Sequence, residues 1–99
     1  MLKAAFIFLA PGAEPTQHKS EVQTPEVELK VVGVKDYQAA EEVIKKLVAE
    51  GVKAIELCGG FGHEGVARAV RVAGGDVAVG AVRFDVHPGL NGKSGDTIF

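Results

Sequence analysis

The sequence predicts a small α/β protein: one domain with about four mostly parallel strands and two crossover helices. Short apolar runs that suit strands alternate along the chain with segments whose apolar residues recur at helical spacing. Two consecutive strand–helix–strand units imply parallel strands joined by right-handed crossovers. The 99 residues have room for one domain with one modest core.

Two strands are predicted in the first third of the chain. Residues 3–9 form a short apolar run typical of a buried strand, and the sequence leaves its direction in the sheet open. Residues 26–34 alternate between apolar and charged side chains, with Val27, Leu29 and Val31 on the apolar face. This alternation indicates a half-exposed strand near a sheet edge.

Two helices are predicted, at residues 37–50 and 63–73. The first has Asp36 as its N-cap and Gly51 just after its end, and Gly74 ends the second. Two ion pairs at i,i+4 spacing are expected on the exposed face of the first helix: Glu41–Lys45 and Glu42–Lys46.

The remaining two strands are predicted at residues 52–58 and 77–86. The last one is nearly continuous in apolar residues, which is typical of a central strand. Residues 11–25 form a long loop with three prolines, and loops of this length in small domains are generally functional or disordered. The loop is predicted either as a lid, with His18 as a ligand-binding residue, or as a solvated connector.

Composition and charge narrow the classes of function. A net charge of −2 with dispersed basic residues does not suit nucleic-acid binding, and no apolar stretch has the length of a membrane span. The single cysteine and the absence of a cofactor motif lead us to expect a cytoplasmic protein without a cofactor. Because 46% of so short a chain is hydrophobic, we also expect a homo-oligomer.

The stretch CGGFGHEG, residues 58–65, follows a predicted strand and precedes a predicted helix. Gly59, Gly60 and Gly62 would let backbone N–H groups approach a ligand at the carboxyl edge of the sheet. The helix dipole at this point favours an anion. The spacing matches neither the dinucleotide-binding fingerprint nor a P-loop, and the alternative is a tight strand-to-helix turn.

Cys58 and Glu56 precede this loop on the same strand. Cys58 is a candidate nucleophile with His63 as its base, although free cysteine is more often buried. Glu56 is either functional, paired with a residue such as Arg83, or placed on an uncovered sheet face.

Arg83, Asp85 and His87 alternate along the end of the last predicted strand and therefore point the same way. An arginine suits an anion, and an aspartate that orients a histidine suits proton transfer. Asp85 and His87 would also suit a metal ion together with His18 or His63, although no compact ligand motif is present. The alternative interpretation is a set of surface charges where a strand emerges.

Three stretches together resemble a family of short prokaryotic proteins classed as a domain of unknown function: AAFIFLAPGAEPTQHK, AIELCGGFG and VRFDVHPGLNGKSGD. The resemblance covers nearly the whole chain, and it implies a stand-alone domain without assigning a catalytic residue. A weaker likeness connects GVKAIEL with βα-barrel aldolases, in which a functional glutamate matches Glu56. Those enzymes need a Schiff-base lysine on a later strand, and this chain has Arg83 there. They also need a barrel of about 250 residues, which the 99 residues of this chain cannot form.

Three hypotheses of function follow. The first is a protein that binds a small anionic metabolite at the carboxyl edge of the sheet, through the loop glycines and Arg83. The second is a non-enzymatic structural or oligomerisation module. The third is an aldolase- or isomerase-like enzyme that uses Glu56 and His87. Any acid–base chemistry would use four side chains: Glu56, His63, Asp85 and His87.

Overall fold

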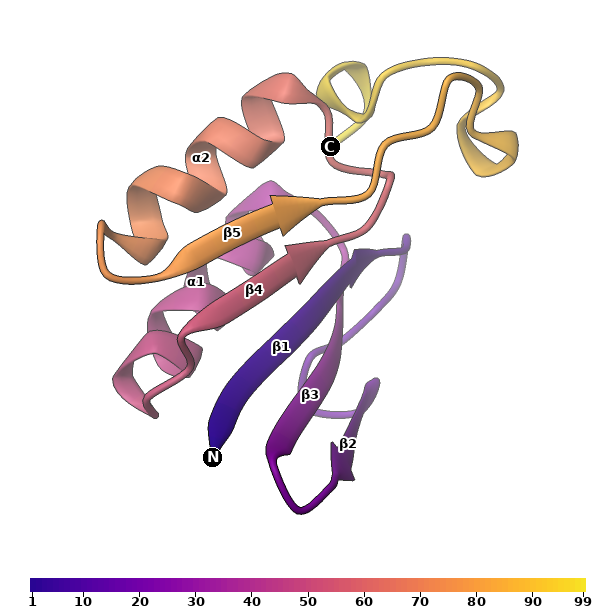
Figure 1. Ribbon diagram of the computed structural model, residues 1–99. Coiled ribbons are helices and arrows are strands. Elements are labelled where there is room, and N and C mark those ends of the chain that lie inside the picture. Colours follow the sequence, from indigo (N-terminus) through magenta and orange to yellow (C-terminus); the bar gives the residue numbers. More distant parts are fainter.

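The computed structural model describes residues 1–99 as a five-stranded sheet with both α-helices on one face (Figure 1). The elements in chain order are β1 (Leu2–Leu9), β2 (Lys19–Gln23), β3 (Val27–Val34), α1 (Tyr37–Ala49), β4 (Ala54–Leu57), α2 (His63–Ala73), β5 (Ala78–Ala81), and the 3-10 turns η1 (Pro88–Leu90) and η2 (Gly95–Thr97). The predicted α/β class is confirmed. None of the helices combines the length and hydropathy needed to cross a membrane.

The strand order in the sheet is β2-β3-β1-β4-β5. β1 lies in the centre and runs parallel to β3 and β4, which settles the direction that the sequence left open. β5 is parallel to β4, whereas β2 is antiparallel to β3. Both strand–helix–strand units advance in the same direction across the sheet, so right-handed crossovers place α1 and α2 on the same face.

The core lies between that face and the two helices. Its largest fully buried side chains are Ile7, Val34, Ile44, Val52, Ile55 and Leu57. The predicted caps of α1 are confirmed: an Asp36 carboxyl oxygen accepts a hydrogen bond from the Ala39 N–H at 2.8 Å, and Gly51 follows the helix with a φ of +96°.

Two predictions about the strands were wrong. Residues 11–25 were predicted to be a loop, but they contain the strand β2, which forms because β3 offers it a free edge for antiparallel pairing. The last strand ends at Ala81, not at residue 86, and it lies at the sheet edge. β4 ends at Leu57, so Val82 is the last residue of this segment to donate a hydrogen bond to β4, from its N–H to the Leu57 carbonyl at 2.9 Å.

The predicted i,i+4 pairs of α1 were also wrong. Glu42 contacts Lys45 at i,i+3 spacing, with 3.5 Å between Oε1 and Nζ. Glu41 instead binds Arg68 of α2 at 2.6 Å, and this ion pair ties the two helices together.

β3 turns a different face to the helices than its apolar alternation suggests. Val32 and Val34 are buried under the helices, whereas Val27, Leu29 and Val31 lie on the opposite face, which no helix covers. On the helix side, the Lys30 ammonium binds the Glu50 carboxylate at the end of α1 at 2.8 Å, so charged residues lie on the covered side of the sheet.

Candidate functional site

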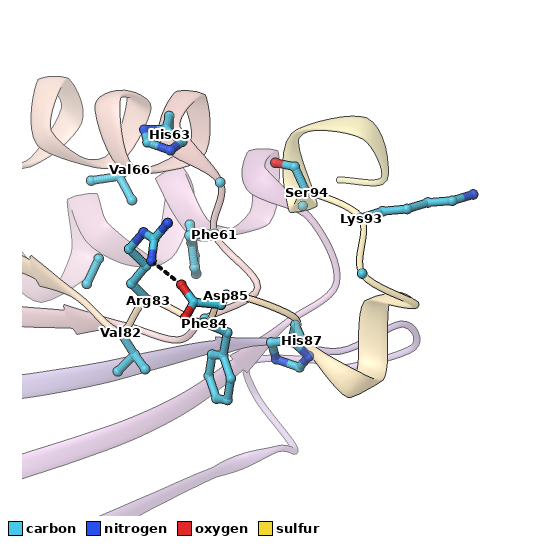
Figure 2. Close-up of a pocket in the computed structure, with 15 residues that line it drawn as sticks. Phe61, His63, Val66, Val82, Arg83, Phe84, Asp85, His87, Lys93 and Ser94 are labelled. Carbon is cyan, nitrogen blue, oxygen red and sulfur yellow. Dashed lines mark hydrogen bonds and ion pairs between the residues drawn. The ribbon is translucent and has the colours of Figure 1, made fainter.

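A cleft of about 540 Å3 opens at the carboxyl edge of the sheet, between α2 and the segment that follows β5 (Figure 2). Parallel sheets bind ligands at this edge, and the volume lies within the range of small-molecule sites. The tail folds back over the same edge, and Lys93, Ser94 and Gly95 form part of the cleft wall.

The cleft brings together most of the predicted site residues. Six of them line it: Gly59, Gly62, His63, Arg83, Asp85 and His87. Four others, Glu56, Cys58, Gly60 and His18, do not line it.

Arg83 and Asp85 form an exposed ion pair in the cleft. A guanidinium nitrogen of Arg83 donates to an Asp85 carboxylate oxygen at 2.6 Å, with 77% and 91% of the two side chains exposed. Arg83 points toward α2 in Figure 2, whereas Val82 and Phe84 point to the opposite side. The alternation predicted for the last strand thus continues past Ala81, although the strand pairing does not.

His87 is held by its own backbone rather than by Asp85. Its Nδ1 accepts a hydrogen bond from the Gly89 N–H at 3.0 Å, so in the neutral ring Nε2 carries the proton. The ring packs against Phe84 with 4.6 Å between centroids. The predicted orientation of His87 by Asp85 is not formed, because the partner of Asp85 is Arg83.

The glycines of residues 58–65 make room for the protein's own side chains. A Cβ at Gly59 would overlap the ring of Phe84, and a Cβ at Gly62 would overlap Asp96 and Ser94 of the tail. These contacts favour the interpretation of the loop as a tight turn onto which other segments dock.

The N-terminus of α2 already holds an anion, which is Asp96 of the tail. The N-cap residue, Gly62, has no side chain to cap the helix. Asp96 takes over this function, and its two carboxylate oxygens accept hydrogen bonds from the N–H groups of Glu64 and Gly65, each at 3.0 Å. The dipole effect predicted for an external anion therefore acts on a carboxylate of the same chain.

Tyr37 completes this arrangement. Its hydroxyl donates to Asp96 at 2.8 Å and accepts from the Gly62 N–H at 3.0 Å. Burial raises the pKa of Tyr37 to about 12, with Asp96 adding to the effect and the Gly62 N–H opposing it. Burial alone would raise the pKa of Asp96, but hydrogen bonds from Glu64, Tyr37 and Gly65 outweigh burial and hold that pKa below its ordinary value of 3.8.

We expect Asp96→Ala to lower the free energy of unfolding by about 1 kcal/mol at neutral pH, as the loss of a helix cap does. A lowered pKa means that the carboxylate stabilises the folded state fully above the ordinary value and loses this effect as the pH falls through the folded-state pKa. The difference from wild type should therefore disappear in acid. Urea unfolding over a pH series measures it, with the exposed Asp76→Ala as control, and a difference that persists in acid would contradict this role.

Three predicted residues lie outside the cleft in different surroundings. Glu56 is exposed on the uncovered face of β4. Cys58 is half-buried, and its Sγ accepts hydrogen bonds from the N–H groups of Leu9 and Gly60, each at 3.3 Å. His18 accepts a hydrogen bond within the loop before β2, from the Glu14 N–H at 2.8 Å.

The metal alternative lacks a ligand set. No group of three or more His, Cys, Asp or Glu side chains is arranged to hold a metal ion. Asp85 and His87 lie at the same cleft as His63, but the three do not form such a group.

The sequence analysis did not predict that Asp96 caps α2 or that Tyr37 binds Asp96. The signal was present in two places: the residue before the helix predicted at 63–73 is a glycine, which cannot cap it, and the tail carries Ser94-Gly95-Asp96, in which a short polar side chain follows a flexible residue. Nothing in the sequence connects segments that are 32 residues apart.

The comparisons with known proteins identify a family. A model described as "Family of unknown function (DUF6506)" matches residues 2–97, which confirms the expected resemblance to a domain of unknown function. No curated protein and no solved structure matches the chain.

Proposed function

We propose that this chain, which belongs to the DUF6506 family of unknown function, binds a small anionic metabolite in the cleft at the carboxyl edge of its sheet. One observation carries the proposal. Although the protein has a net charge of −2, the residues that line this cleft include one arginine and two histidines: Arg83, His63 and His87. Lys93 also lines it, with its side chain extending outward in Figure 2. Asp85, the partner of Arg83, is the one carboxylate among the lining residues.

The proposed contacts are side chains, because the backbone amides at the start of α2 already bind Asp96. Arg83 is the main counter-charge: its guanidinium is exposed and paired with Asp85, so a ligand carboxylate or phosphate can replace that partner with bidentate geometry. His87 adds a donor through Nε2. We propose the cytoplasm as the location, where the single cysteine stays reduced.

Acid–base chemistry in this cleft would use His63 and His87 with Asp85. An aldolase- or isomerase-like reaction that pairs Glu56 with His87 has no support in the geometry, because Glu56 lies on the uncovered face of the sheet and does not line the cleft.

A thermal-shift screen with phosphorylated sugars, keto acids and nucleotides tests the proposal. We expect one class to raise the melting temperature of the wild type, since a ligand that binds the folded state stabilises it. Arg83→Ala should weaken binding of that class about 10- to 100-fold, the effect of losing one charged hydrogen bond. Arg71→Ala, on an exposed arginine that does not line the cleft, is the matched control. Equal affinity of the Arg83→Ala variant and the wild type would remove Arg83 from the site.

A further inference from the structure

The face of the sheet opposite the helices is uncovered over all five strands (Figure 1). In doubly wound folds helices cover both faces of a parallel sheet. Here the connection from β1 to β3 contains β2 and no helix, so no helix of the chain covers that second face.

The uncovered face is apolar and nearly free of charge. The register of the strands places the following side chains on it: Leu2, Ala4, Phe6, Phe8, Ser20, Val22, Val27, Leu29, Val31, Ala54, Glu56 and Ala78. The large apolar residues among them do not belong to the core cluster, and Leu2 and Val22 are 45% and 52% exposed. Glu56 is the one charged residue.

The charged residues of the same strands lie on the other side. Lys3, Lys30 and Glu28 of the central strands, and Lys19 and Glu21 of β2, occupy the alternate positions, which face the helices or the space beside them. A solvated sheet surface carries its charges outward, because an apolar face in water is costly. This sheet has the reverse arrangement, as expected for a face that is buried in an assembly.

We propose that this face binds the same face of a second copy of the chain, so that two sheets stack in a two-fold symmetric dimer. Because Glu56 is the one charge on this face, packing the face on its own copy brings few like charges together, as a two-fold interface requires. An anionic partner such as nucleic acid or a membrane surface would instead need basic residues, and the face has none.

The size of the face suits such a dimer. Five strands about 4.8 Å apart, with the longest rising about 3.3 Å per residue, outline a face of roughly 20 Å by 25 Å, on the order of 500 Å2 before side-chain relief is counted. Specific interfaces bury about 600 Å2 or more per partner. Val82 and Phe84, exposed by 45% and 48%, extend the apolar area past the end of β5 and bring it to about this size.

Phe6 lies at the centre of the proposed interface. It occupies the middle strand, with Val31 beside it on β3 and Glu56 beside it on β4. Glu56 in turn has Gly80 as its neighbour, and the space above Gly80 is open. The carboxylate can therefore stay in contact with water through the open space above Gly80 while the apolar side chains around Phe6 are buried.

Sedimentation equilibrium over a wide range of protein concentration tests the proposal. We expect the wild type to sediment at twice its mass of 10.3 kDa. Phe6→Lys and Leu29→Lys should each raise the dimer dissociation constant at least 100-fold and leave a folded monomer by circular dichroism. Val70→Lys, at a 48% exposed valine on α2, is the matched control and should remain dimeric. Should Phe6→Lys fail to fold, Leu2→Lys at the rim supplies the same comparison.

Two results would overturn the proposal. One is a wild type that stays monomeric at every concentration. The other is a dimer that survives Phe6→Lys and Leu29→Lys, or Leu2→Lys, because it then uses another surface such as the free edge of β5. Val82 and Phe84 line the cleft as well as the proposed interface, but the substituted residues Leu2, Phe6 and Leu29 do not line it. These three variants therefore test the dimer without altering the anion site.

Discussion

Tyr37→Ala is expected to lower the free energy of unfolding by about 3–5 kcal/mol, as the loss of a buried aromatic ring does. Tyr37 is only 4% exposed, and its ring stacks on Phe61 with 5.6 Å between centroids and lies 6.2 Å from the ring of Phe99. The Arg68 guanidinium lies 5.6 Å from its centre. One side chain thus joins α1 to α2 and to the tail, and its removal leaves a cavity at their junction.

Tyr37→Phe separates the ring from the hydroxyl. It keeps the packing but leaves Asp96 without one donor and the Gly62 N–H without its acceptor. We expect a cost of about 1–3 kcal/mol, the penalty for hydrogen-bond partners left unpaired. Urea unfolding followed by circular dichroism measures both variants. If both variants lost the same free energy of unfolding, the hydroxyl and not the ring would be what holds the junction together.

Gly95→Ala is expected to displace the tail from the body of the protein. A Cβ at Gly95 would overlap the carbonyl oxygen of Gly60, a backbone atom that a rotamer change cannot move. The Asp96 cap is then lost, and overpacking of this kind costs about 1–3 kcal/mol. Gly75→Ala is the matched control, because a Cβ there meets open space.

Tyr37 reports the displacement directly, since the chain has one tyrosine and no tryptophan. We expect an absorbance titration of the Gly95→Ala variant to move the pKa of Tyr37 from about 12 toward the ordinary value of 10, because the ring gains access to water. Limited proteolysis should cut the variant after residue 91 faster than the wild type. An unchanged pKa of Tyr37 would contradict the docking role of Gly95.

Local signals predicted the helices and the class of fold well. Asp36, Gly51 and Gly74 bound the two helices where the sequence placed them, because capping depends on residues within one turn. β2 could not be predicted from its own residues, since it is fully exposed and exists only because β3 pairs with it. The last strand was predicted too long because its alternation continues beyond the end of β4.

The candidate site was predicted in its location but not in its contacts. The carboxyl-edge rule placed Arg83, His87 and the glycine loop at one cleft. The rule says nothing about which anion occupies a helix N-terminus, and here Asp96 reaches it from the tail. The apolar side of β3 was recognised, but whether it faces the helices or the open side depends on its register with β1, which the sequence alone does not specify.

The position of Asp96 also sets an order of events during translation. Glu64, at the start of α2, leaves the ribosome 32 residues before Asp96, a delay of about 2–6 s at 5–20 residues per second. During that time the first amides of α2 have only water as partners, and Tyr37 lacks its acceptor. A nascent chain from which residues 63–73 have emerged, but Asp96 has not, therefore carries a second helix without its cap, and the domain closes only when Asp96 has emerged.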